Sequence, residues 1–321
     1  SGKLNTNLDL YFDNNLKIVN FIAKGEVKEM RGYLTKNLVA KGASFNFFFD
    51  KSDLIIKNTK MNLNGILLKS GNLYLTRGDN INLKSEFSTD IKLDKNNLKS
   101  YSFFLNEIKF KNNFNNLNVN LDHVLNIKFD KTLKVLDYEY NNKGNVENFS
   151  YNLNIPKNDF IPQDIKTIEL NQSDIEIKYH SDKNYTVYSK GKYKLNNGNL
   201  QNFELTNNSS KVSNDLDLSF ETNQELNIDF INFQKKDNGS AKVNSKISIK
   251  KDIIIFKEIE FKQNKNLIIL KNFKISKKKL VSLQNLKVKT FINSNVNNDF
   301  EINIGKKVSV KGKKYDAENL S

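Results

Sequence analysis

The chain has 321 residues, 38% of them apolar, which is enough to bury a core in one large or two medium domains. It has no cysteine and only two histidines, which excludes disulfides, thiolate nucleophiles and thiolate metal sites. The formal charge is +15, but only Arg31 and Arg77 among the 51 basic residues are arginine. Because base and phosphate recognition favours the planar guanidinium group, we expect no nucleic-acid partner.

The first part of the chain alternates weakly between apolar and polar residues. Leu4, Leu8, Leu10 and Phe12 predict one strand, and the cluster Phe45, Phe47 and Phe49 predicts another. Between these strands, residues 25–38 are predicted to form a short helix. The three phenylalanines supply a large apolar area on one strand, which could line either a packed core or a lipid-filled groove.

Two longer segments alternate with period two, so that one row of side chains lies on a dry face and the other in water. A helix would need spacings of three and four, so both segments are predicted strands. The row of the first segment contains Ile81, Leu83, Phe87, Ile91 and Leu93, with Ser85 and Thr89 between them. The row of the second contains Leu117, Val119, Leu121, His123, Leu125, Ile127 and Phe129.

Both prolines of the chain, Pro156 and Pro162, interrupt this pattern. Proline cannot donate a hydrogen bond to a strand partner, so residues 156–165 are predicted to form a crossover. The sequence therefore predicts a first part over residues 1–155 and a continuation over 166–321. Shorter alternating runs continue to the end of the chain, with turns rich in Asn and Gly at 196–198 and 237–239.

The repeated order of strand, turn and strand, some eighteen to twenty times, predicts an all-β fold built as a long antiparallel meander. Thirteen alternating residues span roughly 40 Å, which is longer than the strands of an ordinary sandwich. Long strands with one continuous apolar face favour an elongated, curved, taco-like β-groove with at most a few short helices. Alternation alone also permits a barrel or a sandwich.

No catalytic constellation is predicted. His123 has only Leu121 and Leu125 as neighbours on its face, so we expect it to bond backbone or water, and His180 is expected to be exposed. The acid pairs Asp215 with Asp217 and Glu258 with Glu260 share a face, but a solvated one. The lysine-rich run 271–279 is compatible with anionic lipid headgroups, although a polar turn is the favoured interpretation. The prediction is a protein without enzymatic activity, cofactor or metal.

Two stretches resemble the periplasmic AsmA-like proteins of Gram-negative bacteria, in particular the YhdP-type alphaproteobacterial branch. The first begins at Gly25-Glu26-Val27 and runs through Phe45-Asn46-Phe47 to Tyr74-Leu75. The second, Val310-Lys311-Gly312-Lys313-Lys314-Tyr315-Asp316-Ala317, follows the phrase V-x-G-x-x-x-D-A. The resemblance implies a periplasmic β-groove that passes phospholipids between the inner and outer membranes. It also implies an inner-membrane anchor, in a segment not present in this chain.

We therefore expect an apolar groove that binds phospholipid acyl chains, with components of the two membranes as partners at its ends. The residues expected to face the groove share phase within their strands: Phe45, Phe47, Phe49, Ile81, Leu83, Phe87, Ile91, Leu93, Leu117, Val119, Leu121, Leu125, Ile127 and Phe129. The alternative is a structural surface or adhesin module with a packed core. A glycan-acting enzyme is disfavoured, because no acid pair lies on an apolar face.

Overall fold

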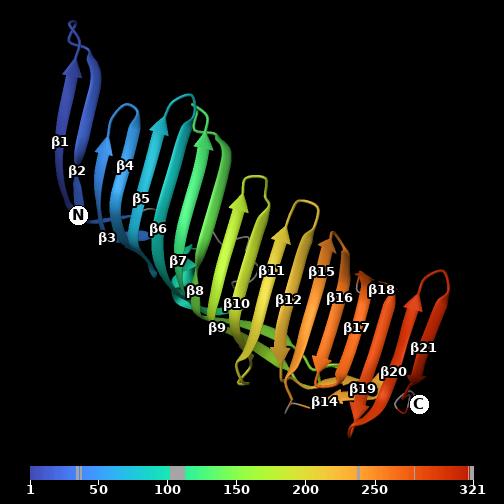
Figure 1. Cartoon of the computed structure of the whole chain (residues 1–321). Coiled ribbons are helices and arrows are strands. Elements are labelled where there is room, and N and C mark those ends of the chain that lie inside the picture. The colour runs from blue at the N-terminus through green and yellow to red at the C-terminus, as the bar shows by residue number, and fades with distance from the viewer. Residues whose placement is uncertain are drawn as a thin grey trace. The chain divides into compact units, whose positions relative to one another are not determined.

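The computed structural model describes residues 1–33, 36, 38–101, 113–236, 239–277, 279–316 and 318. The fold is all-β, as predicted: one antiparallel sheet of 19 strands with a single short helix in the described residues (Figure 1). Neighbouring strands of the sheet follow one another along the chain, so the sheet is a meander. In the described chain the first strand pairs only with the second and the last only with the one before it, so the sheet does not close into a barrel.

Residue contacts divide the chain into two compact units. Unit 1 comprises 1–151 and 174–183, and unit 2 comprises 152–173 and 184–321. The elements of unit 1 are β1 (Lys3–Phe12), β2 (Ile18–Tyr33), β3 (Val39–Phe49), β4 (Asp53–Leu63), β5 (Ile66–Arg77), β6 (Ile81–Asp94), α1 (Lys95–Leu98), η1 (Lys99–Tyr101), β7 (Phe114–Phe129) and most of β8 (Val135–Ile155).

Strand β9 (Ile165–His180) contributes to both units, and the segment with both prolines connects it to β8. Unit 2 continues with β10 (Tyr185–Leu195), β11 (Gln201–Ser209), β12 (Asn214–Thr222), β13 (Leu226–Ile228), η3 (Asp229–Ile231), β14 (Phe233–Lys235), β15 (Ala241–Lys250), β16 (Ile253–Gln263), β17 (Asn266–Ser276), β18 (Lys279–Ser282), β19 (Asn285–Ile292), β20 (Asn295–Ile304) and β21 (Val308–Lys314).

The two strongest alternating segments form strands β6 and β7, which pair in register from Ile81 opposite Phe129 to Asp94 opposite Asn116. Tight turns join many of the strands. Asn64 (φ 46°) and Gly65 (φ 104°) form the connection between β4 and β5, where both residues need the left-handed backbone that Asn and Gly tolerate best. Elsewhere an aspartate closes the turn, as where Asp130 accepts backbone hydrogen bonds from Thr132 and Lys134.

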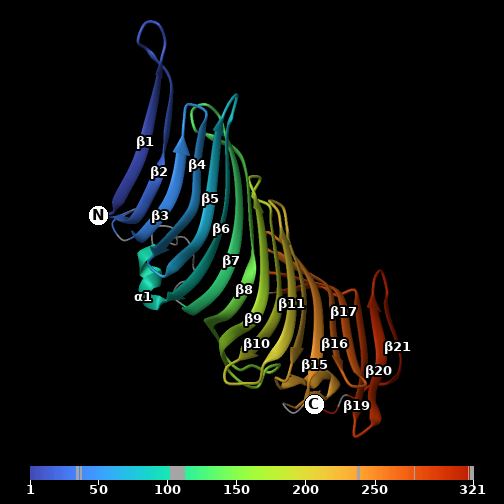
Figure 2. The same cartoon turned by 60° about the vertical axis from the view of Figure 1, so that its left-hand side comes forward.

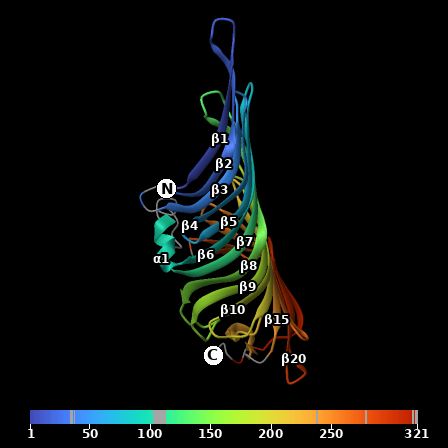
Figure 3. The same ribbon diagram turned by 90° about the vertical axis from the view of Figure 1, so that its left-hand side faces the viewer.

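Bulges bend the long strands. The register of β2 on β3 shifts between Val27 and Met30, and Glu29 between them has a left-handed φ of 51°. Such bulges kink a strand and increase its local twist. Figure 3 shows the strands of unit 1 curving toward the side on which α1 lies, and Figure 2 shows α1 beside the same strands.

The helix predicted over residues 25–38 is wrong. Residues 25–33 belong to β2, and Leu38 precedes β3, while 34, 35 and 37 lie outside the described residues. Pairing with β1 on one side and β3 on the other satisfies the backbone of this segment, which overrides its weak local preference. No helix in the described part of the chain is long and apolar enough to cross a membrane.

Unit 2 contains a packed hydrophobic core. Residues 226–235, formed by β13, η3 and β14 and called here the cap, lie on the sheet over β15 to β20. Ile231 and Phe233 of the cap are buried, and Phe233 meets Phe261 edge to face at 5.7 Å between ring centres. The remaining buried members lie on the sheet: Ala241, Phe261, Ile268, Leu286, Val288 and Phe300.

Hydrogen bonds fasten the cap to β20 and to the end of the chain. Asn298 donates from Nδ2 to the Ile231 carbonyl (2.7 Å) and accepts at Oδ1 from the Asp316 backbone N–H (2.9 Å). The Tyr315 hydroxyl donates to the Phe230 carbonyl at 2.9 Å. These bonds satisfy carbonyls of the η3 turn that the sheet ladder cannot reach, so the cap is an integral part of unit 2.

Candidate functional site: the apolar face of the sheet

Strand pairing places the predicted groove residues on one face. Residues directly opposite each other in paired strands point to the same side of a sheet. In unit 1 this rule joins side chains into rows across β3 to β8, such as Phe49, Leu54, Leu75, Leu83, Ile127 and Tyr138. We call the side that carries this row the apolar face and the opposite side the polar face.

All fourteen predicted groove residues lie on the apolar face of unit 1. Val119 is buried at 3% exposure, and the other thirteen are half-buried. A large aliphatic or aromatic side chain in a packed core would lie mostly below a tenth exposed. This face therefore remains partly open to solvent along β3, β6 and β7.

The apolar face is not continuous, contrary to the prediction. Near the middle of the strands it carries small or polar side chains that are buried, namely Ser85, Thr89, His123 and Asn142. Gly71 and Gly144 occupy the same zone, and a Cβ on Gly144 would lie 1.9 Å from the Asn120 carbonyl oxygen. At Gly144 the backbone of Asn120 lies so close that a side chain would clash with it. The apolar rows flank this polar midline on both sides.

His123 lies at the centre of the midline, and its partners are side chains of neighbouring strands rather than the expected backbone or water. The carboxamide oxygen of Asn142 accepts from Nδ1, so Nε2 accepts from the Thr89 hydroxyl at 2.8 Å. Tyr140 Oη lies 2.9 Å from Nδ1, and the Phe87 ring stacks on the imidazole at 4.4 Å. Burial lowers the pKa of His123, although hydrogen bonding to Asn142 and the charge of Asp122 raise it in part.

Unit 2 carries apolar cross-strand rows of its own. Its pairing joins Leu216, Ile247, Phe256 and Phe273 into one row and Ile249, Ile254, Ile275 and Leu280 into the next. We call these two rows the open strip, because the cap covers the rows nearer the start of β15 and β17 instead. Leu280 is 63% exposed, whereas Val288 under the cap is 1% exposed. The alternation of β12 and β15 could have revealed the strip, but the predicted set contained no residue beyond Phe129.

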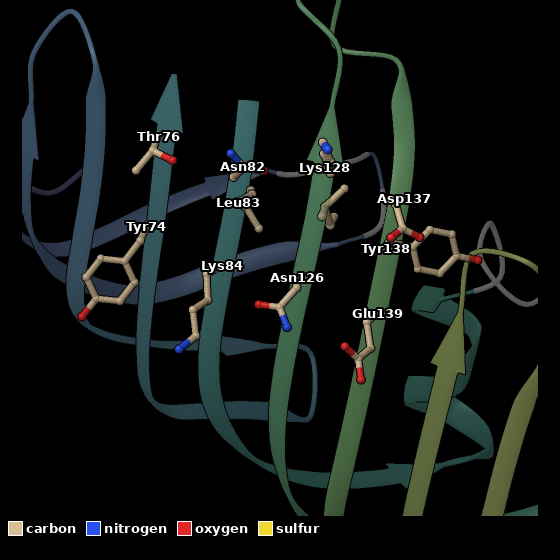
Figure 4. A pocket seen from close by; sticks show the side chains of 11 residues that line it. Tyr74, Thr76, Asn82, Leu83, Lys84, Asn126, Lys128, Asp137, Tyr138 and Glu139 are labelled. Carbon is tan, nitrogen blue, oxygen red and sulfur yellow. The ribbon is translucent and has the colours of Figure 1, made fainter. Parts of the chain in front are cut away.

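The polar face carries alternating charges and amides. Figure 4 shows a shallow depression of about 340 Å³ on this face in unit 1. Tyr74, Lys84, Asn126 and Glu139 form one cross-strand row of its lining. With mixed charge and no enclosed volume, the depression offers no convergent set of groups for catalysis.

The acid pairs Asp215 with Asp217 and Glu258 with Glu260 lie on the side of unit 2 opposite its apolar rows. Asp215 pairs with Lys257 at 3.1 Å, and hydrogen bonds, chiefly from Ser248 and Lys257, lower its pKa. Glu260 pairs with Lys262 at 2.9 Å, and hydrogen bonding to that lysine lowers its pKa. A general acid needs a raised pKa, so neither carboxylate has the environment for that role. His180 is exposed, as expected.

The described residues contain no group of three or more His, Asp or Glu side chains placed to hold a metal ion. Comparisons with protein-family models, with curated proteins and with solved structures find no match to this chain. The apolar face of unit 1, with its flanking rows and polar midline, is the main candidate site in the described residues.

Proposed function

We propose that this chain is part of a non-enzymatic lipid-transport protein, and that its apolar face binds phospholipid acyl chains and lets them pass along the sheet. The observation that carries the proposal is the row of half-buried large apolar side chains across β3 to β8. Each methylene group that leaves water for such a surface contributes about 0.8 kcal/mol. A diacyl lipid therefore gains enough from partial contact to bind, and several equivalent rows allow it to move.

The proposal also includes the location of the protein in the cell. Resemblance to the AsmA-like family supports a periplasmic protein, held at the inner membrane by a segment outside this chain, with membrane components as partners. We propose that lipid moves along the sheet without any chemical step. Transfer along an apolar surface forms and breaks no covalent bond, so it needs no cofactor. The polar face, with ion pairs such as Lys84 with Glu86 at 2.7 Å, would remain in water.

A second candidate is a structural surface module with a packed core. The observation in its favour is the capped core of unit 2, where Ile231, Phe233 and Val288 are buried as in an ordinary globular domain. A structural module would need no ligand on its face. Under this alternative the half-exposed face of unit 1 would pack against protein rather than lipid.

Native mass spectrometry of the chain, purified without detergent, tests the proposal. Phospholipid that co-purifies in defined stoichiometry, and that moves to acceptor vesicles when they are added, supports the lipid-binding function. A chain that stays free of lipid after incubation with phospholipid vesicles contradicts that function and favours the structural module.

A further inference from the structure

The strands of unit 2 run from the cap to an opposite rim. Strand β15 begins at Ala241, buried beneath the cap, and ends at Lys250, while β17 passes from the buried Ile268 to Ser276. Because the sheet is an antiparallel meander, the hairpin turns that follow β11, β15, β17 and β20 all lie at the end away from the cap (Figure 1). We call this end the distal rim of unit 2.

The distal rim is rich in lysine. The turns and the residues that border them contain Lys211, Lys250, Lys251, Lys277, Lys279, Lys306 and Lys307. All seven are exposed, and none makes an ion pair within the described residues. Asp252 is the only acid in the described part of these turns. The described part of the rim therefore carries seven lysines against one aspartate.

The lysine-rich composition of the chain does not by itself explain the lysines at the distal rim. The turns of unit 1 that follow β1, β3, β5 and β7 carry as many acidic as basic residues, for example Asp13 with Lys17 and Asp130 with Lys131. There the aspartates close the turns, as where Asp13 accepts from the Asn15 and Lys17 backbone N–H groups. The excess of lysine over acidic residues is therefore a feature of the turns at the distal rim and not of every turn in the chain.

The lysines border the open strip directly. Ile249 precedes Lys250 in β15, Ile275 lies two residues before Lys277, and Leu280 follows Lys279. Neighbouring strands lie about 4.8 Å apart, so successive hairpins present their lysines at roughly 10 Å intervals, and two turns can reach one phosphate. A phospholipid whose acyl chains lie on the strip would thus place its headgroup among these lysines.

We infer that the distal rim of unit 2 binds the phosphate headgroups of anionic phospholipids whose acyl chains lie on the open strip. This inference rests on the proposed lipid-binding function and adds the orientation and charge class of the lipid. The ammonium groups attract the negative headgroup, while the cap keeps acyl chains away from the opposite end of the strands. A zwitterionic lipid would meet the same strip with weaker attraction at the rim.

The test uses the full chain incubated with vesicles of equal parts zwitterionic and anionic phospholipid. Protein is separated from the vesicles, and the bound lipid is identified by mass spectrometry. We expect anionic lipid to be enriched on the order of tenfold, since two lysines act on one headgroup. The variant K250Q/K251Q/K277Q/K279Q should bind as much total lipid with little enrichment. The matched control K242Q/K246Q/K287Q/K289Q removes the same charge from exposed polar-face positions and should keep the enrichment.

Each contrary outcome has a distinct meaning. Absence of any bound lipid contradicts the proposed function itself. Bound lipid without enrichment, or equal loss of enrichment in the control variant, overturns the rim as a headgroup site and leaves the lipid-binding function standing. A further measurement with inorganic phosphate distinguishes a lipid headgroup from free phosphate as the ligand of the rim. If the rim variant loses binding of inorganic phosphate, measured without lipid, but keeps the enrichment of anionic lipid, the rim is a free-phosphate site and the lipid inference fails.

Discussion

A charge introduced by substitution lowers the unfolding free energy by different amounts at different apolar positions. Leu125 in unit 1 is half-buried on the apolar face beside the midline residue Ser85, so the carboxylate of Leu125→Asp can reach water. We expect a loss of about 1–2 kcal/mol in unfolding free energy, with the circular dichroism spectrum retained and bound lipid strongly reduced. Val288→Asp places an unpaired charge under the cap and should cost about 4 kcal/mol or more.

Urea titration of both variants, followed by circular dichroism, measures this contrast. Similar large losses for Leu125→Asp and Val288→Asp would mean that the face of unit 1 is also a packed core. That result would favour the structural module over the lipid-transport function.

His123 should make stability depend on pH. Burial lowers its pKa in the folded state below the ordinary value of 6.5, so the unfolded chain binds this proton more readily. The stabilising effect of the neutral imidazole is present above pH 6.5 and is lost as pH falls toward the folded-state pKa. Asp122 is the charged group that acts on it, and Tyr140 and Asn142 contact it directly.

The measurement compares unfolding free energies of the wild type and His123→Gln between pH 7.5 and pH 5. We expect the wild type to lose more stability than the variant over this range, because only the wild type carries the imidazole. A variant with the same pH profile as the wild type would show that other groups determine the pH dependence.

At the scale of elements, the cap depends on one asparagine. Asn298 is fully buried and bonds the Ile231 carbonyl, the Thr290 hydroxyl and the Asp316 N–H. Asn298→Ala leaves buried polar groups without partners, which should cost about 2–4 kcal/mol. Limited proteolysis should then cut within 222–240 earlier than in the wild type. Asn303→Ala, at an exposed position of the same strand, is the control and should change stability by less than about 0.5 kcal/mol.

Strands were the most predictable elements. Alternation located β6 and β7 to within a few residues, because one side of each strand faces water and the pattern needs no tertiary information. The cap was not predictable in the same way. Leu226, Ile228 and Phe230 alternate like a strand of the sheet, yet the chain leaves the sheet there and enters the η3 turn at Asp229.

The site was predictable only in part, for a related reason. Phase within a strand identified which residues share a face, and strand pairing then placed all fourteen on the same side. In the polar midline, a bulge brings Gly144 against the backbone of Asn120. The local sequence pattern does not predict such a contact. The lysines of the distal rim come together only once the meander has placed distant turns at one end.

At the scale of the whole molecule, we expect the exposed edge strands to determine which amides exchange hydrogen fastest. Every residue of β1 and β21 is exposed, and each strand has one partner in the described chain. Amide hydrogen exchange should therefore be fastest in these two strands and slowest in β16, β17 and β19 beneath the cap. Protection of β1 equal to that of β17 would contradict this expectation and would indicate that another strand covers the edge.

Because strand pairing follows chain order, the meander affects both how the protein folds and how its number of strands can change by duplication or loss. Each strand finds its partner nearby in sequence, so the contact order is low for an all-β chain and pairing can begin at any hairpin and spread. A hairpin adds two strands at once, so duplication or loss of a hairpin keeps the following strands in their original direction. The sheet can thereby gain or lose length by pairs of strands without redesign of the residues on either side.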